Sequence, residues 1–435
     1  MSVAERLHDF VLGDDRVCVV KAPPGSGKSH NLVHALADLI EAPVRIAIAA
    51  QTNNQVDDLC TQIADAFVHA DIVRFSSGGY SGDLPSNVFV VDKVDSLPSG
   101  PSLVVGTVAK WAISDVLDPY DVLFVDEAWQ MTWADFLTLR DVAARYVLIG
   151  DPGQIPPVVT VDVDRWEVSP VAPHRPAPDV ILDNPELGAV TTRLHLDTCW
   201  RLPHDSVGLV RTFYDFDFDA QAAPGERFLR PRLDLDPTRA TDRAVAALTR
   251  SSTVILTHPS HTDGAVFDPD TELAEVVAGL AERLLGLECE YSAHAEHRTS
   301  PRLLEPSDIG IVSTHNLMNT AIEQALPAAW RGRHGIRVTT PERWQGLQRP
   351  VMIAVHPLSG VEVPSSFDLE TGRLCVMASR HRSACFFVTR DNVGRTLDGH
   401  LPEADQALGR ADVVGRGHAQ HTAFWKYHLD RDLVV

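Results

Sequence analysis

The sequence predicts an α/β protein with two sheets, each parallel and covered by helices on both faces. Short apolar segments alternate with helical patterns through residues 1–150, and a second alternating set begins near residue 253. Strands that are apolar along almost their whole length are typical of parallel sheets buried between helices. The chain has 435 residues, which is enough for about two or three domains of ordinary size.

The individual elements follow from runs of β-branched residues and from helical periodicity. In the first set, strands are predicted at 17–22, 45–50, 71–75, 103–108, 122–128 and 146–151, with helices between them at 31–40 and 53–67. In the second set, strands are predicted at 253–259, 308–314, 335–340, 351–357 and 384–390, with a long helix at 271–289. Two stretches rich in Pro and Asp are predicted to be irregular, at 160–195 and 220–245. The segment YDFDFD at 214–219 fits either an edge strand or an acidic loop.

Composition narrows the class of protein. Hydrophobic residues make up 44% and charged residues 22%, which is typical of a soluble globular chain. The net charge of −21 argues against a generally basic surface for nucleic acid, although a local basic groove stays open. No apolar run approaches the ~20 residues of a membrane span, and no secretory signal is evident, so we expect a cytoplasmic protein with no membrane contact. The six scattered cysteines form no CxxC pair and favour reduced core positions over a zinc site.

A phosphate-binding loop is predicted where the first strand meets the first long helix of the sheet. Residues 22–29 read APPGSGKS, and small residues at this point expose backbone N–H groups to phosphate oxygens. The formal pattern has Gly where Ala22 stands, and the alternative is a simple Gly-rich turn. The strand–loop–helix context favours the phosphate loop. The expected nucleotide contacts are Pro24, Gly25, Ser26, Gly27, Lys28 and Ser29, with Lys28 reaching the β- and γ-phosphates and the Ser29 hydroxyl binding Mg²⁺.

Two further strand ends carry polar residues. In VLFVDEAWQ, residues 122–130, Asp126 is expected to hold the metal and Glu127 to act as the general base, although a solvated loop start is an alternative. In LIGDPGQIPPV, residues 148–158, the amide of Gln154 can bond both a γ-phosphate and a water. Because ligands bind at the carboxyl ends of parallel strands, these groups are expected to converge with Lys28.

The order of these motifs, P-loop, DEAxQ and GDPxQxPP, resembles superfamily 1 helicases, in the branch that includes the nonsense-mediated decay helicase. The resemblance implies two RecA-like P-loop NTPase lobes, at residues 1–200 and 201–435, with a helical tail at the C-terminus. Each lobe would be a parallel sheet with helices on both faces, and the nucleotide site would lie in the cleft between them.

Other segments extend the resemblance. LDTCWRLPH (196–204) implies that Arg201 reaches the γ-phosphate, LCVMASRHR (374–382) implies an arginine finger at Arg380, and Gln348 corresponds to a residue near the nucleotide ribose. Without the resemblance, both arginines would be interpreted as surface salt-bridge residues. An aromatic residue that the family often has near His315 is missing. Motifs similar to those that contact nucleic acid imply contacts from Gln51, Thr52, Asn53, Thr107, Thr314, Thr340 and Gln345.

Two functions are consistent with the sequence. The first is an ATP-dependent helicase or single-strand translocase, which hydrolyses ATP with Mg²⁺, binds single-stranded DNA or RNA and acts as a monomer. The alternative is a P-loop ATPase switch that acts on a protein partner without unwinding; the acidic net charge favours it, whereas the matches in the nucleic-acid motifs favour the motor. A pseudo-enzyme is disfavoured because all the expected catalytic residues are present. Histidine-containing segments are interpreted without a metal: His294, Glu296 and His297 as a loop, and His418, His421 and His428 as solvated or packed against Trp425.

Overall fold

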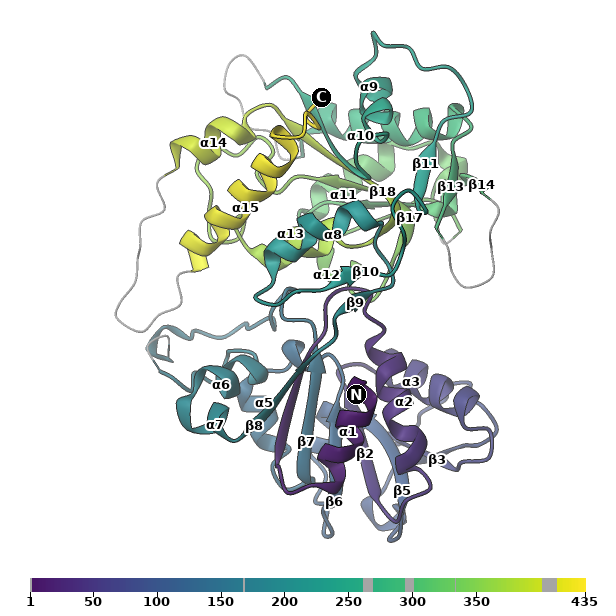
Figure 1. Ribbon diagram of the computed structural model, residues 1–435, viewed down its shortest axis with the longest axis vertical. Helices are drawn as coiled ribbons and strands as arrows, with labels where there is room; N and C mark the ends of the chain where they lie inside the picture. Colours follow the sequence, from purple (N-terminus) through teal and green to yellow (C-terminus); the bar gives the residue numbers. More distant parts are fainter. Residues whose placement is uncertain (1, 167–168, 261–268, 294–300, 333, 401–412) are drawn as a thin grey trace. The chain divides into compact units, whose positions relative to one another are not determined.

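The chain forms two compact units, each built around its own parallel sheet (Figure 1). Among the described residues, unit 1 comprises the chain up to Pro152 together with Pro156–Asp197, and unit 2 comprises Gly153–Ile155 and the residues from Thr198 onward. The predicted α/β fold class with two parallel sheets is therefore confirmed. The computed structural model describes residues 2–166, 169–260, 269–293, 301–332, 334–400 and 413–435.

Unit 1 contains one sheet of eight strands in the order β4-β3-β5-β2-β6-β7-β1-β8, and every pairing in it is parallel. Its strands are β1 (Val17–Lys21), β2 (Arg45–Ala50), β3 (Ile72–Phe75), β4 (Val88–Val91), β5 (Ser102–Thr107), β6 (Tyr120–Val125), β7 (Ala143–Gly150) and β8 (Thr191–His195). Its helices are α1 (Val3–Leu12), α2 (Lys28–Leu39), α3 (Asn53–Ala66), α4 (Val108–Ala112), α5 (Trp133–Thr138), α6 (Ala177–Asp183) and α7 (Pro185–Ala189).

Alternate residues of these strands face two separate cores, as the two-residue period of a strand requires. Cys18 and Val20 of β1 pack with α1, α2 and α3 on one face, whereas Val19 packs on the other face with residues of α4 and α6. Both faces of the central strands are thus apolar, which explains why the sequence showed continuous hydrophobic runs there.

Unit 2 contains a five-stranded sheet in the order β12-β18-β17-β15-β16, also wholly parallel. Its strands, with those of two small accessory sheets, are β9 (Thr198–Cys199), β10 (Asp219–Ala220), β11 (Phe228–Arg230), β12 (Thr253–His258), β13 (Glu290–Ser292), β14 (Arg302–Leu303), β15 (Ile309–Val312), β16 (Arg337–Thr339), β17 (Arg349–Val355) and β18 (His381–Arg390). Its helices are α8 (His204–Val210), α9 (Ala240–Ala247), α10 (Thr271–Gly286), α11 (Asn316–Ala325), α12 (Pro341–Trp344), α13 (Thr371–Ala378), α14 (Val393–Gly399) and α15 (Val413–Leu429).

The unit 2 sheet is also covered on both faces. Helices α9, α10 and α11 contribute to one core, and α8, α13 and α15 contribute to the other. After α15 the chain runs parallel to β12, where Ile255 donates its N–H to Leu433 and accepts a bond from the N–H of Val435, both at 2.9 Å. The last residues therefore extend the edge of the sheet. Within the described part of the chain, no helix is long and apolar enough to cross a membrane.

The strands expected in both sets are present, but two expectations about irregular segments are wrong. Residues 160–195 hold α6, α7 and β8, and residues 220–245 hold β11 and the start of α9. Strand β8 lies at the sheet edge, and Leu194 is its only buried residue, so it lacked the apolar run that marks a central strand. Helices α6 and α7 are too short to show a helical period. The expected helix at 271–289 ends at Gly286.

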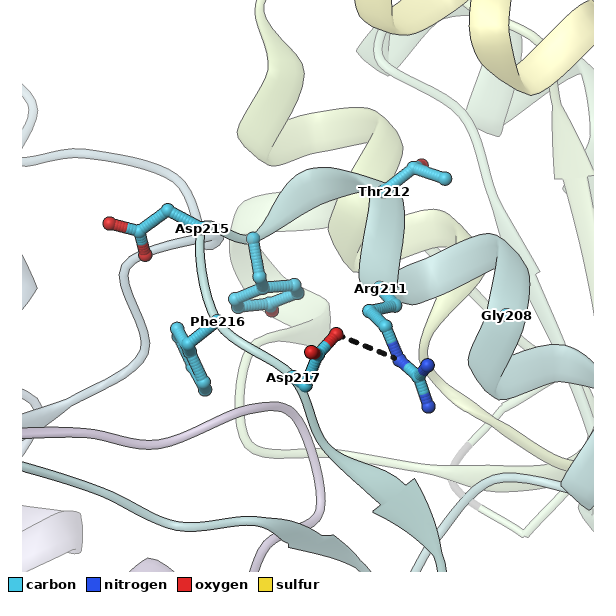
Figure 2. Close-up of a pocket in the computed structure, with 7 residues that line it drawn as sticks. Gly208, Arg211, Thr212, Asp215, Phe216 and Asp217 are labelled. Carbon is cyan, nitrogen blue, oxygen red and sulfur yellow. Dashed lines mark ion pairs between the residues drawn. The ribbon is translucent and has the colours of Figure 1, made fainter.

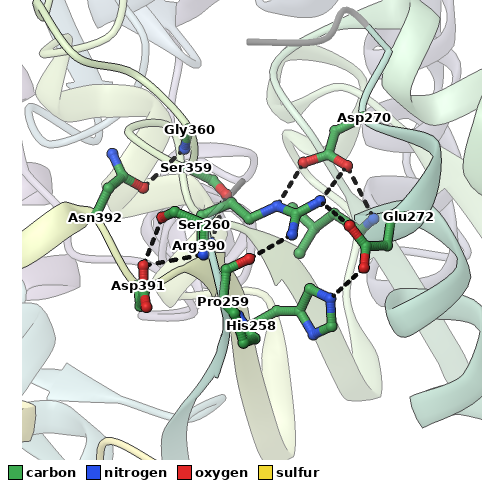
Figure 3. Close-up of polar contacts among 11 residues, drawn as sticks. His258, Pro259, Ser260, Asp270, Glu272, Ser359, Gly360, Arg390, Asp391 and Asn392 are labelled. Atoms are coloured by element: carbon green, nitrogen blue, oxygen red, sulfur yellow. Dashed lines mark hydrogen bonds and ion pairs between the residues drawn. The ribbon is translucent and has the colours of Figure 1, made fainter. Parts of the chain in front are cut away.

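A network of polar side chains around the buried Arg390 joins three elements of unit 2 at the carboxyl edge of its sheet (Figure 3). Arg390, at the end of β18, is 2% exposed and donates two hydrogen bonds to Asp270, at 2.7 and 2.8 Å, and a third to Glu272, at 2.9 Å. Asp270 also caps the first turn of α10, and His258 at the end of β12 bonds Glu272 at 3.0 Å. The buried guanidinium is therefore paired with carboxylates, as a buried charge requires.

The histidines of α15 lie mainly in the core. His421 and His428 are fully buried, so the expectation that they could be solvated is wrong for these two. The ring of His421 lies 5.4 Å from that of His356, at the end of β17, and His428 bonds Thr253 at 3.2 Å. Burial lowers the pKa of His421 to about 3 and that of His428 to about 4, and it places the pKa of His356 well below its usual range. All six cysteines are buried free thiols, as expected.

These histidines predict a loss of stability in mild acid. Their neutral form is favoured in the folded state, whereas in the unfolded state each would bind a proton near pH 6.5. The free energy of unfolding should therefore be unaffected by these groups above about pH 6.5, and should fall between about pH 6.5 and 4 by up to about 1.4 kcal/mol per pH unit for each histidine. Urea unfolding at a series of pH values measures this slope.

A single substitution isolates one contribution to that slope. Neither ring nitrogen of His421 has a hydrogen-bond partner among the described residues. Phe at this position therefore keeps an aromatic ring and removes only the titration. The slope in His421→Phe should be smaller by about 1.4 kcal/mol per pH unit. An unchanged slope would show that His421 does not contribute.

Candidate functional site

The carboxyl edge of the unit 1 sheet brings three polar segments together. Strands β1, β6 and β7 are neighbours, with Lys21 in register with Gly150 and Val125 with Leu148. The segment 22–27 follows β1, the acidic pair Asp126–Glu127 follows β6, and Asp151 follows β7. The parallel topology thus gathers the P-loop and the acidic residues at one edge, where α/β proteins bind ligands.

The loop between β1 and α2 has the backbone conformation of an anion-binding nest. Gly25 and Gly27 have φ values of 69° and 74°, in the left-handed region that residues with a Cβ rarely adopt. Gly27 precedes the first residue of α2, and no side chain caps the free N–H groups of that helix. The hydroxyl of Ser26 is buried and has no hydrogen-bond partner in the described residues. These donors fit a phosphate group at the helix N-terminus.

Lys28 sits among three carboxylates. Its Nζ lies 3.0 Å from Oε1 of Glu127, and both side chains are about one-seventh exposed. Burial opposes the charge on Lys28, but the negative charges of Glu127, Asp151 and Asp126 outweigh it and raise the lysine pKa. Burial and the neighbouring Glu127 raise the pKa of Asp126 to about 6, against the opposing effect of Lys28. The site therefore concentrates more negative than positive charge, which a divalent cation would offset.

The backbone turns sharply at the acidic pair that follows β6. Glu127 has a φ of 52°, which is strained for a residue with a side chain, and its N–H donates to Oδ1 of Asp126 at 2.9 Å. Ser29 lies in the first turn of α2 and is half-buried. The hydroxyl of Ser29, in the first turn of α2, and the carboxylate of Asp126, after β6, are hard oxygen donors at the same edge of the sheet. Such a set suits Mg²⁺, which keeps its remaining positions for water and substrate phosphates.

Residues expected to contact nucleic acid occupy the same edge, at the carboxyl ends of β2 and β5; β2 pairs with β6 on one side and with β5 on the other. Thr52 caps α3 by accepting a bond from the N–H of Gln55, and Thr107 caps α4 through the N–H of Lys110. The side-chain nitrogen of Gln51 is buried without a partner among the described residues. The amide oxygen of Asn53 accepts a bond from Arg74 at 2.8 Å. In unit 1, the residues predicted to bind the nucleotide and those predicted to bind nucleic acid therefore lie along the same edge of the sheet.

In unit 2, the residues expected to face the nucleotide gather at the amino edge of the sheet. Arg201 donates a hydrogen bond from Nε to the amide oxygen of Gln348 at 2.9 Å and another from Nη1 to the carbonyl of Ser379 at 3.1 Å. Gln348 immediately precedes β17, and Arg380 immediately precedes β18. The structure therefore brings Arg201, Gln348 and the segment of Arg380 together, although they are far apart in the sequence.

Arg380 is a buried cation whose donors are not all used. The residue is 1% exposed, and its Nε and Nη2 have no hydrogen-bond partner within the described parts of the chain. Arg390, equally buried, is paired with two carboxylates. An uncompensated buried charge is costly, and the two nitrogens of Arg380 that have no partner among the described residues are donors of the kind that can bind an anion.

Two of the remaining residues of unit 2 with an expected role in nucleic-acid binding lie toward the opposite, carboxyl edge. Thr314 follows β15 and Thr340 follows β16, and these strands pair with Val312 opposite Thr339. The ring of Phe367, from a distant loop, lies 5.6 Å from that of His315. Gln345 lies between α12 and β17, and its buried amide nitrogen has no partner among the described residues.

For two residues after β7, Asp151 and Gln154, the structure adds to what the sequence predicts. Asp151 is 1% exposed and acts electrostatically on Lys28, yet it was not singled out. An acid at the end of an apolar strand is the same signal that marked Asp126. Gln154 belongs to unit 2, where its backbone lies so close to Gly372 that a Cβ there would come within 2.7 Å of it. Its convergence with Lys28 stays a prediction.

The acidic segment 214–219 is a loop that leads into the short strand β10 and borders a surface pocket of about 410 Å³ (Figure 2). Tyr214, Phe216 and Phe218 pack against one another, whereas the aspartates between them are exposed. The alternation in the sequence therefore separates an aromatic side from an acidic side. His294, Glu296 and His297 lie outside the described residues, and no metal-binding group of three or more His, Cys, Asp or Glu residues is found within them.

Comparisons with known proteins agree with a P-loop domain in unit 1. Residues 4–165, less than half of the chain, match the family model of the AAA domain, and this range contains Lys28, Asp126 and Glu127. Among solved structures, the chain is similar to the PRRSV helicase, with 15% identity and a TM-score of 0.44 over 89% of this chain and 54% of that chain. It is also similar to an arterivirus nonstructural protein 10 (helicase) solved with DNA, with 16% identity and a TM-score of 0.44 over 88% of this chain and 62% of that chain. The chain therefore spans little more than half the length of these structures.

Proposed function

We propose that this protein is an ATP-hydrolysing motor that is stimulated by single-stranded nucleic acid, acting as a helicase or translocase of superfamily 1 type. The observation that carries the proposal is the buried pair of Lys28 and Glu127, 3.0 Å apart, at the sheet edge where the P-loop begins α2. A phosphate-binding loop beside a buried carboxylate is the arrangement that phosphoryl transfer to water requires. The match of residues 4–165 to AAA domains supports the same conclusion. The kinship with the nonsense-mediated decay branch stays a prediction.

In this proposal the residues of unit 1 bind ATP and activate the attacking water. Backbone N–H groups of residues 24–29 hold the phosphates, and Lys28 leaves Glu127 to neutralise the β- and γ-oxygens. Glu127 then accepts the proton of the water that attacks the γ-phosphorus. Ser29 and Asp126 would hold Mg²⁺, which neutralises phosphate charge when bound. Lys28 and Glu127 are paired in the structure, so nucleotide binding would release the carboxylate for its task as base.

The proposed role of unit 2 is to supply charge to the γ-phosphate during hydrolysis. The support is the pair of unused donors on Arg380 and the hydrogen bond between Arg201 and Gln348. Arginine suits this role because its planar guanidinium stays charged and can bind two phosphate oxygens at once. Gln154 would orient the attacking water, and Gln348 would lie near the ribose.

Single-stranded DNA or RNA is the proposed nucleic-acid partner. Gln51, Thr52, Asn53 and Thr107 at the edge of unit 1, and Thr314, Thr340 and Gln345 in unit 2, would contact its backbone. Neutral hydroxyl and amide groups suit an acidic protein, because they bind phosphates without requiring a basic surface.

Nucleic-acid binding can be tested with fluorescently labelled single strands of DNA and of RNA. Fluorescence anisotropy should show binding by the full chain, weakened by about fivefold in Thr340→Val, which removes one hydroxyl worth about 1 kcal/mol. Thr238→Val is a matched control, because Thr238 is an exposed threonine whose hydroxyl donates to Asp236. Equal affinities in the two variants would exclude Thr340 from the contact.

Replacing Glu127 with Gln separates catalysis from binding. The substitution preserves shape and removes basicity, so ATP and Mg²⁺ should still bind while turnover falls by about 10²-fold or more. Phosphate release and binding of a fluorescent ATP analogue measure the two effects. If binding is lost together with turnover, Glu127 holds the metal or the fold and is not the general base.

The second candidate function is an ATPase switch that controls a protein partner. It is favoured by the net charge of −21, which disfavours nonspecific association with nucleic acid. Both candidates predict the effect of Glu127→Gln, because they share the nucleotide site. They differ in the anisotropy experiment, where a switch would bind neither DNA nor RNA.

A further inference from the structure

A cavity of about 340 Å³, lined by arginine and serine residues as well as apolar side chains, lies in unit 2, apart from the residues assigned above to nucleotide or nucleic acid. Its walls come from the start of α8, the segment 224–231 around β11, the last turn of α9 with the residues that follow it, and Ser383 of β18. A volume of this size is within the range of small-molecule sites.

The walls of this cavity carry more positive than negative charge. Arg227, Arg230 and Arg250 all contribute to the lining, and the one carboxylate in the lining belongs to Asp205. That carboxylate is already held by the N–H and hydroxyl of Ser252, at 2.5 and 2.8 Å, and by the hydroxyl of Ser251 at 3.1 Å. In a chain whose net charge is −21, three guanidinium groups around one cavity are a local exception.

The three arginines differ in how they are held. Arg227 is 5% exposed, and its guanidinium donates to the backbone carbonyls of Trp200 and Arg201. Arg230 is exposed and lies over the ring of Phe228, 4.0 Å from its centroid, which leaves its edge donors available for a ligand. Arg250 pairs with Asp432 at 3.5 Å, and both of these side chains are mostly exposed.

The buried member of this set lies close to further positive charge. Burial and the nearby Arg382 lower the pKa of Arg227 to about 10. Like charges in a partly buried site repel each other, and an anion bound between the cavity walls would relieve that repulsion. Arginine is also the residue best suited to bind phosphate oxygens in pairs.

We infer that this cavity is a second anion site, which binds a small ligand bearing a phosphate or pyrophosphate group through Arg227 and Arg230. The site is separate from the P-loop of unit 1. Arg227 donates a hydrogen bond to the backbone carbonyl of Arg201. A ligand bound to Arg227 would therefore restrain the segment that carries Arg201. This effect on the γ-phosphate contact rests on the proposed function.

Pyrophosphate is a suitable probe, and the Lys28→Ala protein is a suitable background because the substitution weakens the P-loop as a competing site. Isothermal titration calorimetry of this full-length variant at constant ionic strength should show binding at one site. Adding Arg230→Ala should weaken that binding by about tenfold or more, the usual effect of losing a charged hydrogen bond. Adding Arg239→Ala should leave it unchanged, because Arg239 is an exposed arginine that pairs with Asp236 outside the cavity. Arg227→Lys should also weaken binding, and it adds a second test only if it folds.

The inference would be overturned if Lys28→Ala bound no pyrophosphate, or if Arg230→Ala and Arg239→Ala bound it equally. A single-stranded oligonucleotide provides a further arm: if it displaced pyrophosphate in a manner that depended on Arg230, the cavity would belong to a nucleic-acid path and not to a small anion. None of these measurements requires hydrolysis of ATP. A failure of the proposed function, seen as an inactive wild-type protein, is therefore distinguishable from a failure of this site.

Discussion

Replacing Arg380 with Ala is expected to cut ATP turnover by about 10³-fold and to leave ATP affinity nearly intact. The guanidinium is buried, and two of its nitrogens have no partner among the described residues, so it is poised to bind an added anion. A contact that forms mainly in the transition state changes kcat much more than ground-state binding. Steady-state phosphate release and equilibrium binding of ATP measure the two quantities.

Two variants make the Arg380 result specific. Arg395→Ala, on an exposed arginine of α14, should retain wild-type turnover. Arg380→Lys keeps a positive charge without the planar fork and should stay well below wild type. Thermal melts of all three proteins show whether the fold is retained. If folded Arg380→Ala hydrolyses ATP at the wild-type rate, or loses affinity and turnover together, Arg380 is not an arginine finger.

Replacing Lys28 with Ala is expected to abolish hydrolysis and to weaken nucleotide binding. The lysine is the cation on which Glu127, Asp126 and Asp151 act, and without it those carboxylates would repel both one another and the phosphates. Lys426→Ala is the matched control, because Lys426 is an exposed lysine of α15. Turnover like that of wild type in Lys28→Ala would exclude the P-loop assignment.

The central part of each sheet could be predicted from the sequence because both of its faces are apolar. The strands β1, β2, β6 and β7 show continuous hydrophobic runs, and their ends carry the P-loop and the acidic pair. Edge elements were harder: β8 is polar except for Leu194 and gave no comparable signal. Contacts between distant segments were not readable at all, as the pairing of Phe367 with His315 illustrates.

Burial of polar groups was the least predictable feature. The sequence does not show whether a histidine of α15 is exposed or buried. His421 and His428 are buried because α15 packs against β12 and the end of β17. In the same way, the sequence marked Arg380 through its motif, but not its burial or its unused donors. These properties depend on tertiary packing and not on local pattern.

The most direct test of the central claim is the rate of ATP hydrolysis by the full chain with Mg²⁺, measured with and without single-stranded DNA or RNA. A nucleic-acid motor predicts that at least one of the two raises the rate to a saturating level, and that the stimulation disappears in Glu127→Gln. If the wild-type protein hydrolyses ATP at one rate whether or not either nucleic acid is present, the motor is contradicted and the ATPase switch takes its place.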